Sequence, residues 1–283
     1  MRILLTGRNG QVGWELQRTL APLGTMVATD RATLDLADPD AIRRAVREAK
    51  ADVIVNAAAY TAVDRAESEP GLAAAVNARA PGVLAEEARR SGALLVHYST
   101  DYVFDGTKQG AYREDDATNP LSVYGRTKRD GELAVVESGC RYLLLRTSWV
   151  YAPRGRNFFL TILRRARAGE ALRVVNDQTG VPATSAFVAE MSSLALRARD
   201  AGGIYHLVPG GRTTWYGFAR AIAEGSGLDA PITPIATKDY PVAARRPANS
   251  VLDNSGFRKR FSVDLPDWQA GLAACLKTYG EAA

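Results

Sequence analysis

The sequence predicts an α/β fold, with a doubly wound parallel sheet and a second, smaller α/β lobe for a substrate. Over the first 150 residues, apolar runs rich in Val, Ile and Leu alternate with helical patterns. This order is typical of a parallel sheet that helices cover on both faces. The first apolar run enters a glycine-rich turn, and ligands of such sheets lie along the carboxyl ends of the strands. We therefore expect the functional site at that edge.

The predicted strands of the first lobe are near-continuous apolar runs, which suits burial on both faces. They span residues 3–6, 26–29, 53–58, 94–99 and 143–147. The helices predicted between them include residues 40–50, 71–90 and 120–136, besides one that opens after the glycine-rich turn.

The pattern of elements changes after Trp149. Loops there are rich in Pro and Gly, and they separate predicted helices at 157–167, 185–199, 214–225 and 265–279 from predicted strands at 173–176 and 204–208. We expect residues 1–148 to form a dinucleotide-binding domain and residues 149–283 mainly a substrate-binding lobe. No linker or repeat divides them cleanly, so segments of the second part are expected to return to the first.

Composition narrows the class of protein. The 283 residues are 46% hydrophobic and 24% charged, and no apolar run approaches the roughly 18 residues of a membrane span. The first residues read as a strand, so we expect no signal peptide. Cys140 and Cys275 are far apart without metal-ligand spacing, which favours a reducing cytoplasm.

The net charge of +5 is scattered over helices and loops, without the basic stripe of a nucleic-acid-binding protein. One basic pair, Arg245 and Arg246, stands in a predicted loop before Pro247. It either binds a phosphate through its guanidinium forks or is a solvated surface pair.

Three glycines, Gly7, Gly10 and Gly13, follow the first predicted strand at intervals of three residues. This spacing is weak evidence by itself. Here it opens a predicted helix whose apolar residues recur every four positions, at Val12, Leu16 and Leu20. A strand, a glycine turn and a helix in this order predict a dinucleotide site, with the pyrophosphate at the helix N-terminus.

Tyr124 and Lys128 stand four residues apart in a predicted helix, so a phenol and an ammonium share one face. The bland alternative is a pair of solvated surface residues. Asn119 and Pro120 look like an N-cap followed by the first helical residue, which predicts Tyr124 in the second turn. Together with the two hydroxyls that end the run at 97–101, these residues predict a hydride-transfer site.

Longer motifs resemble a known family. They include His-Tyr-Ser-Thr-Asp-Tyr-Val-Phe at 97–104, Arg-Thr-Ser-Trp-Val-Tyr-Ala at 146–152, Asn-Asp-Gln at 176–178 and Thr-Thr-Trp-Tyr at 213–216. Over almost its whole length the chain resembles the extended short-chain dehydrogenases/reductases, and among them the dTDP-4-dehydrorhamnose reductases.

The resemblance implies an NADPH- or NADH-dependent reduction of the C4 ketone of dTDP-4-dehydro-L-rhamnose to dTDP-L-rhamnose. It implies Tyr124 as the proton donor, Thr100 as the hydroxyl that polarises the ketone, and Lys128 as the group that holds the cofactor. Lys128 and the oxidised nicotinamide are expected to lower the pKa of Tyr124 toward the working range.

The same resemblance implies the binding residues. Substrate is expected at Thr100, Asp101 and Trp149, the alternatives being a turn role for Thr100 and interlobe packing for Trp149. Trp215 and Trp268 are expected to be packing residues. The residues implied for the cofactor are Gly7, Gly10, Gln11, Val12, Gly13, Asp30, Arg31, Asp35, Leu36, Ala59, Tyr60, Thr61 and Tyr98, with Tyr124 and Lys128.

Cofactor preference and assembly are less defined. Asp30 favours a free ribose 2′-hydroxyl, whereas Arg31 favours a 2′-phosphate, so both NADH and NADPH are expected. Some reductases of this family dimerise through Mg²⁺ held by glutamates. Only Glu15 matches such a position and Ala186 stands at another, so we expect no metal and a monomer or weak homodimer.

Two other functions stay open. The first is a nucleotide-sugar epimerase or dehydratase of the same superfamily, which would use the same Tyr and Lys. A dehydratase is disfavoured because Tyr102, rather than Glu, follows Thr100 and Asp101. The second is a non-catalytic regulatory subunit that resembles the methionine adenosyltransferase β subunit.

Overall fold

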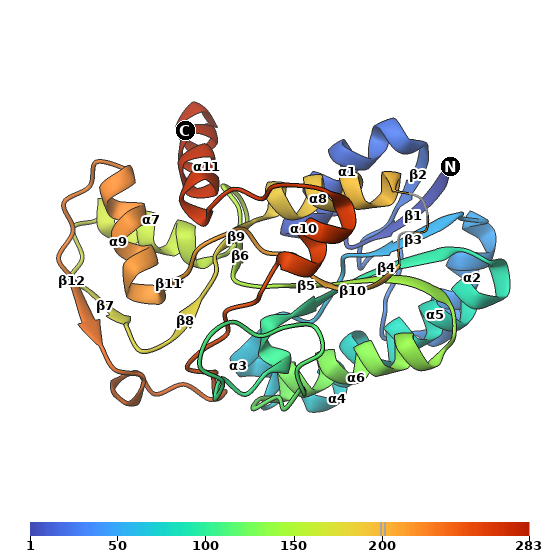
Figure 1. The fold of residues 1–283 in the computed structure, drawn as a ribbon, viewed down its shortest axis with the longest axis horizontal. Coiled ribbons are helices and arrows are strands. Elements are labelled where there is room, and N and C mark those ends of the chain that lie inside the picture. Colours follow the sequence, from blue (N-terminus) through green and yellow to red (C-terminus); the bar gives the residue numbers. More distant parts are fainter. Residues whose placement is uncertain (199, 201, 283) are drawn as a thin grey trace.

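The computed structural model describes residues 1–198, 200 and 202–282. Its centre is a six-stranded sheet in the order β10-β5-β4-β3-β1-β2, in which every neighbouring pair is parallel (Figure 1). The strands are β1 (Arg2–Thr6), β2 (Thr25–Ala28), β3 (Val53–Asn56), β4 (Leu94–Thr100), β5 (Arg141–Thr147) and β10 (Gly203–His206). The predicted fold class, a doubly wound parallel sheet, is confirmed.

Helices cover both faces of this sheet. On one face, residues such as Leu16 and Val188 pack against Ile3 and Leu5, and on the other Ile42 and Leu84 pack against the intervening strand residues. Alternate residues of one strand thus enter two different cores, which explains why the strands are apolar throughout. The first face carries α1 (Gln11–Leu20), α8 (Ser185–Arg197) and α10 (Ser255–Phe261), and the second carries α2 (Pro39–Ala49), α5 (Ala80–Ser91) and α6 (Val123–Glu137).

Short elements connect the main ones. The predicted helix over 71–90 is divided into α4 (Pro70–Ala74), a π-helical turn η2 (Ala75–Arg79) and α5. Three further short helices are η1 (Ala21–Leu23), α3 (Val63–Ala66) and η3 (Asp101–Val103).

The smaller lobe has its own core, in which Phe159, Phe218 and Leu272 are buried. Three helices surround it, α7 (Phe158–Arg167), α9 (Trp215–Gly225) and α11 (Trp268–Ala282). Its strands form three two-stranded pairs, β7 (Leu172–Val175) with β12 (Ile232–Ile235), β8 (Thr179–Gly180) with β11 (Thr213–Thr214), and β6 (Val150–Tyr151) with β9 (Ala183–Thr184); η4 (Thr237–Asp239) follows β12. The sequence pattern predicted the three helices and β7. It did not predict β12, the two-residue strands or α10.

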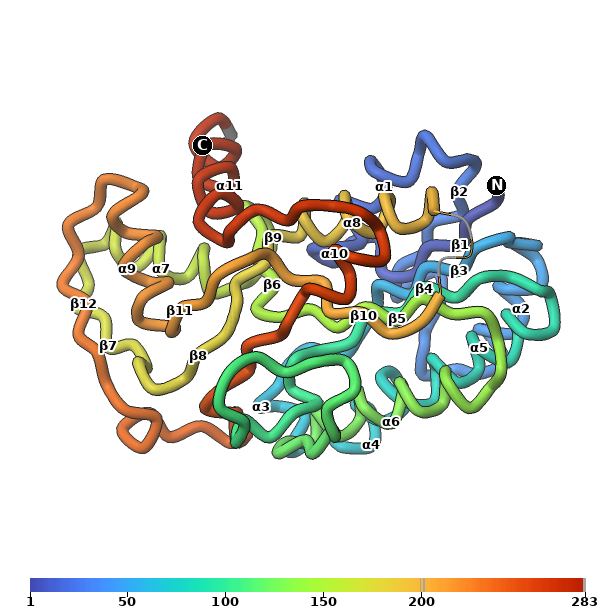
Figure 2. The backbone as a smooth tube through the Cα atoms, viewed as in Figure 1, coloured from blue at the N-terminus to red at the C-terminus, as the bar shows by residue number. Residues whose placement is uncertain are grey.

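The chain crosses between the lobes more than once, as the continuous tube in Figure 2 makes visible. From the smaller lobe it returns to the sheet as α8, which packs along α1, and as β10, which pairs with β5. Hydrogen bonds fix the first contact: Thr19 Oγ1 donates to the carbonyl of Ala189 at 3.3 Å, and Ser193 Oγ donates to that of Thr19 at 2.8 Å.

Helix α6 begins later than predicted. Its N-cap is Ser122, whose Oγ accepts from the amide of Gly125 at 3.1 Å. Asn119, the predicted cap, lies three residues before this N-cap, and its Nδ2 donates to the Asp105 carboxylate at 3.0 Å. Tyr124 consequently lies in the first turn of the helix, not the second.

No helix in the described part of the chain is both long and apolar enough to span a membrane. Cys140 and Cys275 are free thiols, and both are buried. Burial raises the pKa of the Cys275 thiol to about 12, so this group stays protonated at neutral pH.

Candidate active site

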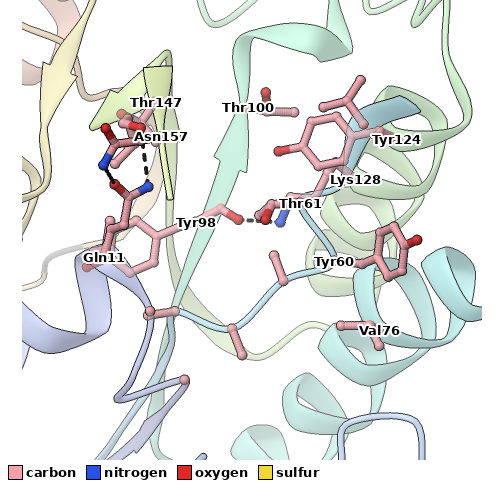
Figure 3. Close-up of a pocket in the computed structure, with 18 of the residues that line it drawn as sticks. Gln11, Tyr60, Thr61, Val76, Tyr98, Thr100, Tyr124, Lys128, Thr147 and Asn157 are labelled. Atoms are coloured by element: carbon pink, nitrogen blue, oxygen red, sulfur yellow. Dashed lines mark hydrogen bonds between the residues drawn. The ribbon is translucent and has the colours of Figure 1, made fainter. Parts of the chain in front are cut away.

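A cavity of about 890 Å³ lies at the carboxyl ends of the strands, between the sheet and the smaller lobe (Figure 3). The structure brings together in its lining all but one of the residues implied for cofactor and substrate. Those that line it are Gly7, Gly10, Gln11, Val12, Asp30, Arg31, Asp35, Leu36, Ala59, Tyr60, Thr61, Tyr98, Thr100, Asp101, Tyr124, Lys128 and Trp149.

Gly13 is the exception. A Cβ at this position would lie 2.0 Å from the carbonyl oxygen of Gly7, so the residue brings α1 against the turn rather than facing the cavity. Gly7 itself has a φ of 73° and approaches Ala58 closely. Gly10 is the N-cap of α1 in an extended conformation, with no side-chain cap bond. The turn therefore directs backbone amides of the first helical residues toward the cavity.

Asp30, just after β2, accepts several hydrogen bonds from the glycine-rich turn. Its Oδ2 accepts from Arg8 Nη2 at 2.7 Å, from Arg8 Nε at 3.0 Å and from Asn9 Nδ2 at 3.0 Å. The Arg8 guanidinium lowers the pKa of this carboxyl to about 2. Arg8 was not among the residues implied for the cofactor, although it stands inside the glycine-rich turn.

The hydroxyl groups of Tyr60 and Tyr98 donate hydrogen bonds to other side chains of the protein. The Tyr60 hydroxyl donates to Glu69 at 2.7 Å, which raises the pKa of the phenol. The Tyr98 hydroxyl donates to Ser192 on α8 at 2.7 Å. What these residues offer the cavity is therefore ring surface and backbone, not the hydroxyl.

Tyr124 and Lys128 project from α6 toward the end of β4, with Thr100 opposite the Tyr124 ring (Figure 3). The side chain of Thr100 hydrogen bonds to Tyr124, yet burial raises the pKa of the phenol to about 12. Desolvation of the phenolate is thus the largest influence on this pKa in the ligand-free protein. The predicted lowering by Lys128 and an oxidised nicotinamide concerns the cofactor complex and stays a prediction.

Lys128 is 2% exposed, and its ammonium donates to the carbonyl oxygen of Tyr98 at 2.5 Å. Its Nζ also lies 3.5 Å from Nε2 of His97. Burial lowers the pKa of Lys128 to about 8, against the opposing effect of the Glu132 carboxylate.

Several polar atoms of the cavity wall have no hydrogen-bond partner among the residues that the structure describes. They are Ser99 Oγ, Asp101 Oδ2, Thr147 Oγ1 and Trp149 Nε1. Asp101 is 2% exposed, its Oδ1 accepts from Thr100 Oγ1 at 3.0 Å, and burial raises its pKa to about 7. Buried polar atoms are normally paired, so these four atoms are the unsatisfied hydrogen-bonding groups directly beneath the cavity surface.

An aromatic wall faces these atoms from the smaller lobe. Trp149 has a left-handed backbone, with a φ of 45°, and its ring stacks on Trp215 with centroids 3.6 Å apart and an angle of 8°. Phe158 packs on Trp215 at 4.7 Å. The packing role predicted for Trp215 is incomplete, because this residue lines the cavity; Trp268 is buried against Phe218, as expected of a packing residue.

Comparison with known proteins identifies the chain's relatives. The model of the family described as the RmlD substrate binding domain matches residues 1–281. A dTDP-4-dehydrorhamnose reductase of Burkholderia thailandensis is 49% identical over 293 aligned positions that cover 98% of either chain. One of Escherichia coli K12 is 45% identical, with 98% of this chain and 97% of the relative covered. The chain belongs to the dTDP-4-dehydrorhamnose reductase family.

Solved structures agree with this membership. A dTDP-4-dehydrorhamnose reductase of Bacillus anthracis in complex with NADP superposes with a TM-score of 0.94 at 33% identity, over 98% of this chain and 99% of that one. A Thermus thermophilus UDP-glucose 4-epimerase complex with NAD, at 23% identity and a TM-score of 0.84, shares the fold. The family resemblance predicted from the motifs is confirmed.

Two long-range side-chain pairs complete the cavity of this reductase-family chain. Arg246 pairs with Asp64 at 2.7 Å and lines the cavity, while Arg245 is exposed. Asn157 Nδ2 donates to Gln11 Oε1 at 2.8 Å, which ties the smaller lobe to the glycine-rich turn. The sequence signalled the Arg pair but not which member faces inward, because that depends on its long-range partner.

Glu15 is the residue that matches a magnesium-ligand position of some reductases of this family. Within residues 1–198, 200 and 202–282, no three His, Cys, Asp or Glu side chains cluster as metal ligands. The Glu15 carboxylate lies 3.5 Å from the guanidinium of Arg18 one turn along α1.

Proposed function

We propose that this chain reduces the C4 ketone of dTDP-4-dehydro-L-rhamnose to dTDP-L-rhamnose, with NADPH or NADH as the hydride donor. Family membership supports the reaction, and the NADP complex of the Bacillus anthracis relative supports the cofactor. One observation carries the proposal: Tyr124, Thr100 and Lys128 line the same cavity as the glycine-rich turn at the N-terminus of α1.

The residues present fit a dinucleotide. Gly7 and Gly10 leave the approach to α1 free of side chains, and Gln11 and Val12 offer the amides that a pyrophosphate needs. We propose Asp30, with Arg31, Asp35 and Leu36, for the adenosine end. Ala59, Tyr60, Thr61 and Tyr98 would contact the rest of the dinucleotide.

When bound, the reduced dinucleotide supplies the hydride to the ketone carbon. Tyr124 then gives its phenolic proton to the oxygen that becomes the C4 hydroxyl, and solvent returns a proton to the phenolate afterwards. A pKa of about 12 keeps this phenol protonated at neutral pH, which suits a proton donor. Thr100 turns its hydroxyl hydrogen from Asp101 Oδ1 to the ketone oxygen, and Lys128 holds the nicotinamide ribose.

For the sugar nucleotide we propose Asp101, Thr100 and Trp149 as contacts. The unpartnered Oδ2 of Asp101 suits a sugar hydroxyl, and the Trp149 ring suits an apolar sugar face. We propose further that residues 1–148 supply mainly the dinucleotide side of the cavity and residues 149–283 mainly the sugar side.

We also propose a cytoplasmic protein that acts without a metal, as a monomer or a weak homodimer. A single carboxylate such as Glu15 binds Mg²⁺ weakly, since that ion prefers several oxygen ligands. Activity is therefore expected to persist in excess EDTA, and light scattering is expected to give the same mass with and without Mg²⁺. Activity lost to EDTA and restored by Mg²⁺ contradicts this.

The test of the reaction is the loss of reduced-nicotinamide absorbance when the keto-sugar nucleotide is added to the purified chain. One equivalent of dTDP-L-rhamnose per NADPH oxidised is the expected result. An epimerase or dehydratase would convert a sugar nucleotide without net NADPH oxidation. A regulatory subunit would bind the nucleotides without turnover, and either outcome contradicts the proposal.

A further inference from the structure

Behind the cavity wall, a buried chain of polar side chains ends at Lys128. Thr6 Oγ1 lies 2.7 Å from Asn56 Oδ1, and Asn56 Nδ2 lies 3.1 Å from His97 Nδ1. His97 Nε2 then lies 3.5 Å from Lys128 Nζ. The four side chains are 0–2% exposed. Thr6 and Lys128 are part of the cavity lining, while Asn56 and His97 lie behind it and have no place in the mechanism above.

The hydrogen bonds of this series of side chains, from Thr6 to Lys128, can be arranged in two ways. Burial, together with Lys128, holds the pKa of His97 well below its usual value, so the ring is neutral and carries one N–H. If the Asn56 amide donates to Nδ1, the N–H stands on Nε2 and only a neutral amine at Lys128 can accept it. If the amide is turned, its oxygen accepts from Nδ1–H, and Nε2 accepts from the Lys128 ammonium.

Thr6 serves both arrangements, because a hydroxyl donates and accepts. In the first it donates to Asn56 Oδ1. In the second it accepts from Asn56 Nδ2, and its own hydrogen becomes free to point into the cavity beside the glycine-rich turn. Thr6 and Lys128, the two ends of this series of side chains, are therefore linked through hydrogen positions and the orientation of the Asn56 amide.

We propose that His97 is a positioning residue for Lys128, whose neutral ring changes tautomer with the charge of Lys128. With the ammonium present the ring proton is on Nδ1 and Nε2 holds Lys128 in place. When Lys128 releases its proton to the cavity, the ring proton moves to Nε2 and Asn56 turns, so the charge of His97 does not change. This inference rests on the role proposed for Lys128 in binding the cofactor ribose.

The other groups around Lys128 do not provide such a switch. Glu132, one turn along α6, is held in a bidentate pair by Arg146 at 2.7 and 2.9 Å, so both of its carboxylate oxygens are engaged away from His97. Tyr124, one turn back on α6, stays protonated below its pKa of about 12. From β4, Tyr98 contributes a backbone carbonyl. His97, with Asn56 of β3 behind it, is the partner that can change between donor and acceptor.

The second histidine of the chain provides an internal control. His206 is also fully buried, and its Nε2 also lies 3.5 Å from a cationic nitrogen, Nη1 of Arg146. Arginine keeps its proton at any pH that a protein survives. His206 Nε2 must therefore remain an acceptor, with the ring proton on Nδ1 throughout.

The experiment is ¹⁵N NMR of the two histidine rings in the full-length, ligand-free protein from about pH 6 to about pH 10, since protonated and bare ring nitrogens differ in chemical shift. We expect His97 to pass from the Nδ1–H to the Nε2–H form with a midpoint near the Lys128 pKa of about 8, and His206 to stay unchanged. Lys128→Arg should lock the Nδ1–H form, and Lys128→Met should remove the midpoint.

One tautomer of His97 over the whole range in the wild type, or the same midpoint in Lys128→Met, overturns the proposal. The measurement needs no substrate, so its failure leaves the proposed reaction untouched, and failure of the reductase assay leaves the tautomer result standing.

The pH dependence of kcat/KM is a second test of the role of His97. His97→Leu removes the acceptor and should move the alkaline limb of the kcat/KM profile down by about one to two pH units, because a hydrogen bond to a charge is lost. His97→Gln keeps an acceptor and should move it less. A purely structural role would lower kcat in both variants without moving the limb.

Discussion

The two sides of the cavity hold their polar atoms differently. On the side proposed for the dinucleotide, Asp30 is saturated by Arg8 and Asn9, and Lys128 is bonded to the Tyr98 carbonyl. On the side proposed for the sugar, Asp101 Oδ2 and Thr147 Oγ1 lack partners in the described structure. The first side is paired within the protein, whereas the second leaves buried polar atoms without a partner. Substitutions should therefore affect the two ligands unequally.

The largest expected effect is on turnover. Tyr124→Phe should lower the single-turnover rate by ~10²–10⁴-fold and leave the Kd of NADPH nearly unchanged, because it removes only the positioned acid. Tyr142→Phe, at a half-buried tyrosine of β5 outside the cavity lining, is the matched control. A variant that keeps more than about a tenth of the wild-type rate would assign the acid to another group.

The next largest effect is that of Asp101 on the free energy of unfolding of the ligand-free protein. Its folded pKa of about 7 lies above the unfolded value of 3.8, so the folded state binds the extra proton and stability falls as pH rises from about 4 to about 7. Asp101→Asn should remove up to about 4 kcal/mol of that fall. Denaturant unfolding of both proteins at the two ends of this range measures it. Equal slopes with pH would mean that Asp101 ionises normally in the fold.

A smaller effect concerns cofactor choice on the side proposed for the dinucleotide. Asp30→Ala should shift the ratio of kcat/KM for NADPH over NADH upward by about tenfold, because it removes a carboxylate and frees the Arg8 guanidinium for a 2′-phosphate. Asp40→Ala, at an exposed acid on α2, serves as the control. A shift toward NADH would show that the Asp30 side chain does not face the ribose.

The smallest effect should separate the ligands most clearly. Trp149→Ala should raise the KM of the sugar nucleotide about threefold to tenfold and leave the Kd of NADPH unchanged, since a stacked aromatic contributes ~0.5–1.5 kcal/mol beyond its buried area. Trp215→Ala, which removes its stacking partner, should act in the same direction. If both ligands bind more weakly by the same factor, the pair only packs the lobes together.

The sequence was most informative where one local signal determined the structure. The apolar runs predicted the strands of the parallel sheet, because a strand that is buried on both faces is apolar at every position. The start of α6 was misplaced because Asn119 is engaged by Asp105, fourteen residues away, and Ser122 caps instead. The two-residue strands of the smaller lobe carry too little periodicity to detect.

In the site, too, residues in local motifs could be predicted, whereas residues placed by long-range contacts could not. Motif residues such as Gly10, Thr100 and Tyr124 could be named from the chain and do line one cavity. Gly13 lies outside the lining, where it lets α1 approach the Gly7 carbonyl, and this contact depends on the placement of the helix. Trp215 was missed because only the stack on Trp149, 66 positions earlier, brings it to the cavity. The pKa of Tyr124 depends on desolvation, which no spacing reveals.

The return of the chain to the sheet as β10 has a consequence for how the protein can be divided. Ile204 of β10 pairs with Leu144 of β5 at the edge of the sheet. A fragment that ended at residue 148 would leave β5 as an open edge, with Leu143, Leu144 and Leu145 beside unpaired amides and carbonyls. Such apolar edges template pairing between molecules. The dinucleotide side is thus expected to self-associate when produced alone, and the strand that prevents this is encoded beyond it.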